Sequence, residues 1–596
     1  MRLESPNRIA TRARALFAAL IVFLAACAPV SVPITAPTNV PTATATPSLT
    51  PEPATIATPA LTPAPTATPF PPREPPALIP RRTLFTLVDK TSVSFSRDGT
   101  KISYLAPFNN ALNVWVAPVD KPSEAKPVTS TDRGTRAYYW AQTNNHILYL
   151  QDVDGDENFQ IYSADLTTGS VRTLTARGTR ASLARASPKF PKEILVYSNE
   201  RDSKQFDLYR LNIETGNKTL VLQNNDGFDS FITDDDYNIR FAIRVTSDGG
   251  KEMFKRTDKG AWQSFTKIDL EDESTTYPLS LYRDGKALYL VDSRGRNTGA
   301  LTSIDLQTGA QTVIAQDVRA DISGFITHPT TREAQAVAFE YERQHWFILD
   351  NSIAADMTYL ESVASGDLAL VSRTLDDKRW VVAYSSDTGP TRYYLYDRLA
   401  KKAAFLFSNR AALENLPLAK MYPVIIKSRD GLDLVSYLTL PIESNPDDSP
   451  HPVKPLPLIL YVHGGPWARD SWGYNAIHQW LANRGYAVLS VNYRGSDGFG
   501  KAFLNAGNLE WAGKMHDDLI DGVEWAVNAG IADPKKVCIM GGSYGGYATL
   551  VGLTFTPDVF ACGADSVGPS SLVTLLQNPP PYWSTTADVR KKRVGD

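Results

Sequence analysis

The middle of the chain repeats a short apolar run that is rich in β-branched and aromatic residues and bounded by turn residues. Seven copies begin at residues 101, 146, 193, 239, 287, 336 and 380, so their spacing is 44 to 49 residues. A period in the forties with several strands in each unit is typical of β-propeller blades. A second strand that ends in a Thr-Gly hairpin turn follows in several units, for example at Asp207–Gly216. The pattern predicts a seven-bladed β-propeller over residues 81–415, with a β-sandwich or a β-solenoid as the alternative.

Three charged segments lie at expected hairpin tips of this repeat. Asp152–Asn158 has the alternating oxygen side chains that begin a calcium-binding loop, but no distal glutamate or flanking helix completes an EF-hand. We therefore predict a polar hairpin tip and no metal site there. Asp234–Asp236 and Arg373–Arg379 are predicted to be solvated loops.

Near residue 416 the pattern changes, and continuously apolar runs alternate with amphipathic ones. Two strands around the Asp430-Gly431 turn come first. Apolar strands that alternate with amphipathic helices predict a parallel sheet with both faces covered, so residues 416–596 form a second, α/β domain. The expected strands are Leu456–Val462, Ala487–Asn492, Val537–Met540 and Cys562–Val567, and the expected helices are Tyr474–Asn483, Asp517–Asn528 and one that follows Ser543.

The turn Gly541-Gly542-Ser543-Tyr544-Gly545 connects an apolar strand to a run with helical spacing. A G-x-S-x-G in this context is the nucleophile elbow of an α/β-hydrolase domain. Its serine lies on a strained turn that points the hydroxyl out of the sheet, and side chains two residues before and after it would collide. A glycine-rich turn after any buried strand is the alternative. We predict that Ser543 is a catalytic nucleophile.

The segment His463-Gly464-Gly465-Pro466 follows an apolar strand directly, about eighty residues before the elbow. Attack of a serine on a carbonyl creates an oxyanion, which backbone N–H groups stabilise at about 2.7–3.1 Å. In this fold one N–H comes from the residue after the nucleophile and one from an HGGG-type loop. We therefore predict an oxyanion hole made by the N–H groups of Tyr544 and Gly465.

These segments together resemble the prolyl oligopeptidase family of serine peptidases, especially its acylaminoacyl-peptidase-like and dipeptidyl-peptidase-like bacterial members. The resemblance implies an α/β-hydrolase domain capped by a seven-bladed propeller that admits only short peptides. Some members have a tyrosine in the oxyanion loop where this chain has His463, and Tyr547 is expected to wall the substrate pocket. The matching segments are Ser428–Gly431, His463–Pro466, Asn492–Ser496, Gly498–Gly500, Asp517–Asp518, Gly530–Pro534 and Gly541–Tyr547.

The triad partners of the nucleophile are not found where this fold places them. They follow the serine in the order Ser, Asp, His, but the residues after Ser543 contain no histidine. Asp565, at a strand end, is the least implausible acid, and it is not assigned. The hydrolase domain is therefore expected to be incomplete, as in a fragment of a longer enzyme. As written the chain should be inactive, because loss of the general base costs on the order of 10⁶ in turnover.

The N-terminus has the pattern of a lipoprotein signal peptide over residues 1–27. Four arginines precede the apolar run Ala15–Ala26, which is too short to span a membrane, and Leu24-Ala25-Ala26-Cys27 resembles a lipobox with Cys27 as the acylated residue. An ordinary signal peptide with an incidental cysteine is the alternative. Residues 28–80 are a Thr/Pro/Ala tract that predicts a disordered stalk up to roughly 150 Å long.

Composition limits the remaining choices. The net charge of −3 gives no reason to expect a nucleic-acid partner, and Cys538 and Cys562 lie in apolar runs that predict buried thiols. We predict an exported, lipid-anchored serine peptidase without cofactor that acts on short peptides, of aminopeptidase, dipeptidyl-peptidase or acylaminoacyl-peptidase type. The alternatives are a carboxylesterase, or a surface-anchored binding protein with a vestigial hydrolase domain.

Overall fold

The computed structural model describes residues 73–579 and 586–595. The predicted signal peptide, Cys27 and the predicted stalk up to residue 72 lie outside these residues. Within the described part of the chain, no helix is both long and apolar enough to cross a membrane.

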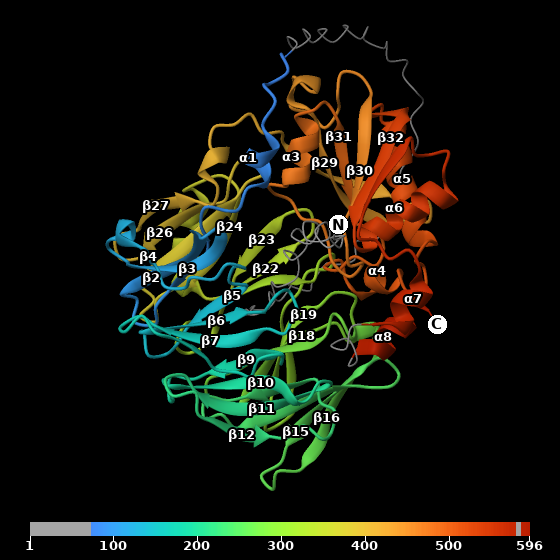
Figure 1. Ribbon diagram of the computed structural model, residues 1–596. Coiled ribbons are helices and arrows are strands. Elements are labelled where there is room, and N and C mark those ends of the chain that lie inside the picture. The colour runs from blue at the N-terminus through green and yellow to red at the C-terminus, as the bar shows by residue number, and fades with distance from the viewer. Residues whose placement is uncertain (1–72, 580–585, 596) are drawn as a thin grey trace, which may run out of the picture.

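Residues 91–408 form seven antiparallel sheets, and each recurring apolar run of the sequence is the second strand of one sheet (Figure 1). Blades 1 to 4 contain β1 (Thr91–Phe95), β2 (Lys101–Phe108), β3 (Ala111–Pro118), β4 (Lys126–Pro127); β5 (Ala137–Trp140), β6 (His146–Gln151), β7 (Gln160–Asp165), β8 (Val171–Thr173); β9 (Ala181–Ala186), β10 (Glu193–Asp202), β11 (Gln205–Asn212), β12 (Lys218–Leu222); and β13 (Ser230–Thr233), β14 (Ile239–Val245), β15 (Lys251–Arg256), β16 (Trp262–Ile268). Blades 5 to 7 contain β17 (Tyr277–Leu281), β18 (Ala287–Asp292), β19 (Ala300–Asp305), β20 (Gln311–Ala315); β21 (Ile322–Thr327), β22 (Ala334–Glu340), β23 (Gln344–Ile348); and β24 (Asp367–Arg373), β25 (Arg379–Ser385), β26 (Arg392–Asp397), β27 (Lys402–Ser408).

The seven sheets close into a ring, which confirms the predicted propeller. One apolar cluster joins Phe95 and Ile102 of blade 1 to Val381 and Phe407 of blade 7. The Phe95 N–H also donates to the Ser372 hydroxyl across the same junction, at 3.1 Å. Blade 6 has three strands. The helix α2 (Ala354–Glu361) follows them and packs in one apolar cluster with residues of blades 6 and 7.

The second domain is a six-stranded sheet in the order β28-β29-β31-β30-β32-β33. Strands β31, β30, β32 and β33 are parallel, as predicted, whereas β28 and β29 form a hairpin that pairs antiparallel with β31. The strands are β28 (Met421–Lys427), β29 (Asp433–Thr439), β30 (Leu456–Val462), β31 (Ala487–Val491), β32 (Ala532–Gly542) and β33 (Cys562–Ser566), and the helices are α3 (Ala476–Ala482), α4 (Lys501–Asn505), α5 (Lys514–Asn528), α6 (Tyr544–Phe555), α7 (Leu572–Gln577) and α8 (Ala587–Val594).

The two domains are stacked on each other (Figure 1). The short helix α1 (Arg81–Phe85) precedes the propeller but packs on α3 of the hydrolase domain, where Phe85 meets Trp480 edge to face. Arg469 donates to the backbone carbonyls of Glu340 and Tyr341 in blade 6, at 2.7 Å each. The hydrolase domain therefore contacts both the helix that precedes the propeller and blade 6 of the propeller itself.

Two of the three charged hairpin tips are not simply solvated, and this part of the prediction was wrong. Asp235 binds Arg185 at 2.6 Å and Arg332 at 2.7 Å, and these partners belong to blades 3 and 6. Asp377 is buried against Arg373 and Arg398. These carboxylates are buried and paired with arginines, so they stabilise the fold. A run of charged residues in the sequence does not reveal such pairing.

The third segment is a polar hairpin tip, as predicted. Asp152–Asn158 connects β6 to β7, and its side chains accept hydrogen bonds from the loop's own backbone and from Arg133. No group of His, Cys, Asp and Glu side chains with metal-binding geometry is present among the described residues.

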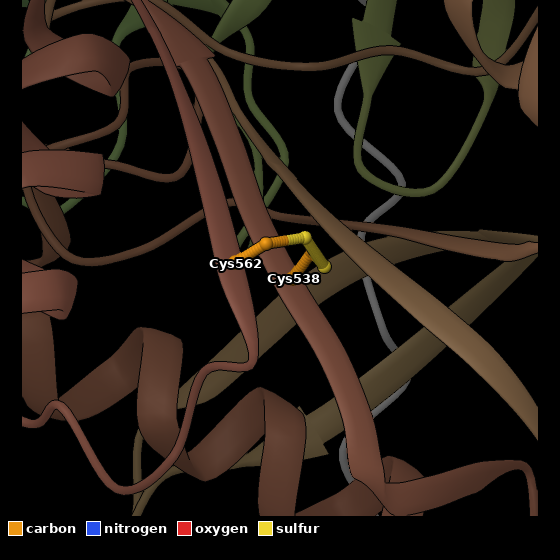
Figure 2. The surroundings of a disulfide bond; sticks show 2 residues. All are labelled: Cys538 and Cys562. Carbon is orange, nitrogen blue, oxygen red and sulfur yellow. A yellow bond between two sulfur atoms is a disulfide. The ribbon is translucent and has the colours of Figure 1, made fainter.

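The prediction that Cys538 and Cys562 are buried thiols was also wrong. Cys538 on β32 and Cys562 on β33 are direct partners in the register of these parallel strands, and their sulfurs form a disulfide (Figure 2). Cys562 is exposed and Cys538 is half-buried, because β33 is the last strand of the described sheet. A separation of 24 residues gives no hint that two strands bring these positions face to face.

Candidate active site

The elbow has the geometry that its sequence predicts. Ser543 lies between β32 and α6 with φ 57° and ψ −119°, a left-handed conformation that is costly for a residue with a side chain. A Cβ on Gly541 would lie 2.5 Å from the Gly545 carbonyl carbon, and a Cβ on Gly545 would lie 2.1 Å from the Val462 carbonyl oxygen. Only glycine fits at these two positions, so α6 can pack against β30 with the serine hydroxyl exposed at the turn.

The loop Gly464-Gly465 after β30 packs directly on the elbow. A Cβ on Gly464 would approach the Gly542 carbonyl oxygen to 3.0 Å and the Ser543 Cβ to 3.4 Å. Gly465 has φ 130°, and a Cβ there would lie 2.8 Å from the Trp467 nitrogen. The absence of both side chains brings this backbone next to the serine.

One cavity of about 220 Å³ contains the predicted nucleophile and both predicted oxyanion donors, Ser543, Tyr544 and Gly465. The Tyr544 N–H is the first of α6, so no carbonyl within the helix accepts it. Two tryptophans, Trp467 and Trp511, line the same side of the cavity. The arrangement can accept a carbonyl carbon at Ser543 and a negatively charged oxygen between two backbone donors.

His463 does not line this cavity. Its Nε2 lies 3.0 Å from the Ser496 Oγ, and its ring stacks on Tyr493 with 4.5 Å between centroids. The His463 Nδ1–H donates to the Gly464 carbonyl at 2.8 Å, and its Nε2 is hydrogen-bonded to the Ser496 hydroxyl. His463 is buried and orients the glycine loop from below.

Tyr547, the predicted pocket wall, lies on α6 one turn beyond the serine. It is half-buried and packs against Trp511 and Tyr544, with centroids 5.5 Å and 5.8 Å away. The residues that line the cavity are its neighbours Trp511 and Tyr544. Its role toward substrate stays a prediction.

No histidine reaches the elbow serine, although all seven lie in described parts of the chain. His516, in the first turn of α5, bonds the Thr556 hydroxyl at 2.9 Å, and burial lowers its pKa. His478 is buried between the Thr439 and Ser490 hydroxyls, and burial lowers its pKa to about 3, so it stays neutral. None of the seven histidines is among the described residues that line the cavity.

Asp565, the least implausible acid by sequence, has a structural role. Its Oδ1 accepts the Gly568 N–H at 2.9 Å and would lie 2.2 Å from a Cβ on Gly546. It therefore fixes the turn after β33, where Val567 and Pro569 form part of the cavity wall.

Three of the recognised sequence segments meet in one ion-pair network instead of at the cavity. Arg494 is buried and makes two hydrogen bonds each to the carboxylates of Asp518 and Asp430, at 2.7–2.9 Å. The free-energy cost of taking these charges out of water is offset because each charge is paired with an opposite charge. The network holds Tyr493 and Ser496, and through them His463 and the glycine loop.

The opposite wall of the cavity was not predicted from the sequence. It comes from α7, through Leu575 and Leu576, and from α8, through Arg590, Lys591 and Val594. The tryptophans Trp467 and Trp511 were likewise missed, although Trp467 directly follows the HGGP segment in the sequence.

A β-propeller stacked on an α/β-hydrolase domain, with an elbow serine lining a cavity, defines a class of propeller-capped serine hydrolases. The sequence profile of the prolyl oligopeptidase family matches residues 472–589. Dipeptidyl aminopeptidase BIII from Pseudoxanthomonas mexicana is 51% identical over 521 residues, which are 87% of this chain and 76% of that protein. The chain belongs to the prolyl oligopeptidase family of serine peptidases.

Two further comparisons agree. Dipeptidyl peptidase family member 6 of Caenorhabditis elegans is 35% identical over 538 residues, covering 85% of this chain and 73% of that protein. The solved structure of a puromycin-hydrolyzing peptidase from Mycobacterium tuberculosis has a TM-score of 0.67 over 88% of this chain and 84% of that chain. At 16% identity this structure supports the fold.

Proposed function

We propose that this serine peptidase cleaves short peptides through Ser543, with the oxyanion held by the N–H groups of Tyr544 and Gly465. The observation that carries the proposal is that these three residues, from two separate loops, line one cavity. The strained backbone of Ser543 supports its assignment as nucleophile, because strain of this kind persists where the fold over-determines it.

We further propose a dipeptidyl-aminopeptidase type of reaction, in which the N-terminal two residues are released. Two relatives that this chain covers over more than 70% of their length are named as dipeptidyl peptidases. Aminopeptidase and acylaminoacyl-peptidase reactions need the same nucleophile and oxyanion hole, so substrate length and N-terminal blocking distinguish them.

The polypeptide of these 596 residues is proposed to have no turnover by itself. A serine hydroxyl needs an imidazole to take its proton and return it to the leaving amine. No histidine of the chain lines the cavity, and none follows Ser543 in the printed sequence.

Rescue by free imidazole tests the proposed roles. A dipeptidyl para-nitrophenyl ester is incubated with the chain at increasing imidazole concentration, beside the variant Ser543→Ala. Imidazole alone also cleaves such an ester, so the measured quantity is the release above the protein-free background. We expect this excess to rise with imidazole in the unaltered chain and not in the variant, because only the base is supplied from solution. Equal release by both proteins would remove Ser543 from the mechanism.

Matched substrates, each tested with imidazole present, separate the remaining functions. Faster reaction of a free dipeptidyl anilide than of an N-acetyl aminoacyl anilide supports the dipeptidyl type. Hydrolysis of simple esters with no reaction of any peptide anilide would support the carboxylesterase. Failure of every substrate, with tight binding of a ligand by the isolated propeller face, would support the anchored binding protein.

Export and lipid anchoring through Cys27 are proposed from the sequence of residues 1–27. The disulfide between Cys538 and Cys562 supports export, because disulfides persist in oxidising compartments outside the cytosol. Metabolic labelling with a radioactive fatty acid should mark the protein in cells, and the variant Cys27→Ala should lose the label. Labelling that survives this substitution would contradict the anchor at Cys27.

A further inference from the structure

The segment Asn492–Ser496 is conspicuous in the sequence, yet none of its residues is among the described residues that line the cavity at Ser543. It follows strand β31 directly, so the end of a buried strand fixes its position. Tyr493 in this segment is completely buried and contacts both of the backbone segments that supply the proposed oxyanion donors. A rigid side chain that contacts two catalytic segments can set the distance between them.

The first contact of Tyr493 is with the start of the glycine loop. Its hydroxyl donates to the His463 carbonyl at 3.1 Å, and its ring stacks on the His463 ring with 4.5 Å between centroids. Burial raises the pKa of Tyr493 well above its usual value, so the hydroxyl keeps its proton and stays a donor. Gly465, whose N–H is proposed to bind the oxyanion, follows two residues after this fixed point.

The preceding residue holds the other end of the same loop. The Asn492 side chain is buried, accepts the Asp470 N–H at 2.7 Å and donates to the Asp470 carbonyl at 3.1 Å. Two consecutive residues therefore fix both ends of the loop His463–Asp470. Gly464 and Gly465 have permissive backbones, so the conformation of this loop depends on contacts of this kind.

The second contact of Tyr493 is with the elbow helix. Its ring stacks on the ring of Tyr544, whose N–H is the other proposed donor, with 5.2 Å between centroids. The ring of Trp511 meets Tyr544 edge to face at 4.7 Å. The rings of His463, Tyr493 and Tyr544 thus form a continuous stack that leads from one donor segment to the other.

We propose that Tyr493 is a positioning residue that sets the distance between the two oxyanion donors, because it holds the loop that carries Gly465 and the ring of Tyr544 in one stack. The inference rests on the oxyanion hole proposed above. Preset donors act where negative charge develops in the transition state, and a displacement of about 1 Å can cost about a hundredfold in rate. A change in donor spacing should therefore lower kcat and leave KM unchanged.

Two substitutions separate the hydrogen bond from the stack. Tyr493→Phe keeps the ring and loses only the hydroxyl, whereas Tyr493→Leu loses the stacked ring as well. The matched control is Tyr437→Phe, in which an equally buried tyrosine of the same domain loses its hydrogen bond to the Glu342 carbonyl, 2.9 Å long and not at the cavity. Release from the dipeptidyl para-nitrophenyl ester at fixed imidazole, above the protein-free background, gives kcat and KM.

A dipeptidyl boronic acid provides a readout without turnover. The Ser543 Oγ bonds to boron while its hydroxyl proton leaves to solvent, and the tetrahedral, negatively charged adduct places an oxygen at the oxyanion position. Calorimetry compares its affinity with that of the corresponding dipeptide amide, which carries no such charge.

We expect Tyr493→Phe to lower kcat about three- to tenfold, as for one lost hydrogen bond, and Tyr493→Leu to lower it about a hundredfold. Affinity for the boronic acid should fall by the same factors. KM and affinity for the amide should stay unchanged, and Tyr437→Phe should match the unaltered chain in every measurement.

Unchanged kcat and boronic-acid affinity in Tyr493→Phe would overturn the proposal, because this variant keeps the packing and loses only the contact with the loop. A rise in KM alone would contradict it too, since the role would then be in substrate binding. An equal loss in Tyr437→Phe would show a general effect of destabilisation and remove the assignment to Tyr493. If the unaltered chain shows no Ser543-dependent release and does not bind the boronic acid, the proposed oxyanion hole is refuted, and the inference with it.

Discussion

At the scale of single residues, the site depends on the absence of side chains at the glycines around Ser543. Its left-handed backbone costs on the order of 1–3 kcal/mol, which the surrounding contacts must offset. The Ser543 N–H donates to the Ser566 carbonyl at 3.0 Å, and the Ser543 carbonyl accepts the Tyr547 N–H at 3.0 Å. The glycines at 541 and 545 permit both contacts, because any side chain there meets backbone atoms that cannot rotate away.

The variant Gly545→Ala tests this argument. Its Cβ would lie 2.1 Å from the Val462 carbonyl oxygen and 2.9 Å from that carbonyl carbon, so α6 must move away from β30. We expect a loss of about 3 kcal/mol in the free energy of unfolding, as for severe overpacking, measured by denaturant titration. Gly389→Ala is the matched control, because nothing lies within 4 Å of its Cβ and its backbone is not left-handed. Equal stability of both variants would contradict the argument.

At the scale of elements, much of the fold could be predicted from the sequence. The strand Leu456–Val462 was predicted with the bounds of β30, and all seven repeated runs are strands, because apolar period and turn residues are local signals. The elbow and the glycine loop are also local motifs. The helices α7 and α8 could not be predicted in this way, since α8 is mostly charged and is held by Arg593 through tertiary contacts. The disulfide was missed for the same reason. It depends on the pairing register of β32 and β33, which the sequence of neither strand determines.

The disulfide offers an element-scale prediction. Closing a loop of 24 residues should contribute roughly 3 kcal/mol by restricting the unfolded chain. It also ties down β33, which leads into the wall residues Val567 and Pro569. We expect reductant to lower the unfolding midpoint of the chain and to have no further effect on Cys562→Ser. If reductant shifts the variant as much as the parent, the stabilisation does not come from this bond.

At the scale of the molecule, ion pairs join parts that are distant in the chain. Asp235 of blade 4 binds Arg185 of blade 3 and Arg332 of blade 6, so the contact with Arg332 passes over blade 5. All three side chains are mostly buried, which makes the pairs stronger than open surface pairs.

Replacing the shared acid should therefore cost more than replacing one of its partners. Asp235→Asn leaves two arginines facing each other without a counter-charge, and we expect a loss of about 1–3 kcal/mol in the free energy of unfolding. Arg332→Gln leaves Asp235 paired with Arg185 and should cost less. Thermal unfolding of both variants measures the difference, and the reverse order would show that Arg332 has a larger role in packing than in charge pairing.

In contrast to Asp235, two carboxylates at the interface of the two domains are buried with little positive charge around them. Asp321 accepts the Gly500 N–H at 3.0 Å and is buried with Asp497 nearby, and burial raises the pKa of both. Arg469 offsets only part of this negative charge. A carboxyl whose pKa is higher in the folded protein contributes stability below its unfolded pKa, and that stability is lost as pH rises through the folded pKa.

The variant Asp497→Asn should therefore be more stable than the parent at pH 7.5, and the difference should shrink towards pH 4.5. The reason is that the parent must keep a desolvated charge at the higher pH, beside Asp321, whereas at the lower pH Asp497 binds a proton. Asp430→Asn is the control of opposite sign: pairing with Arg494 holds the pKa of Asp430 well below its usual range, so this variant should be less stable than its parent at pH 7.5. Thermal unfolding at the two pH values measures both differences. A loss of stability in Asp497→Asn at pH 7.5 would mean that its carboxylate is a favourable ion-pair partner of Arg469 and that the domains are held together by charge attraction at this point.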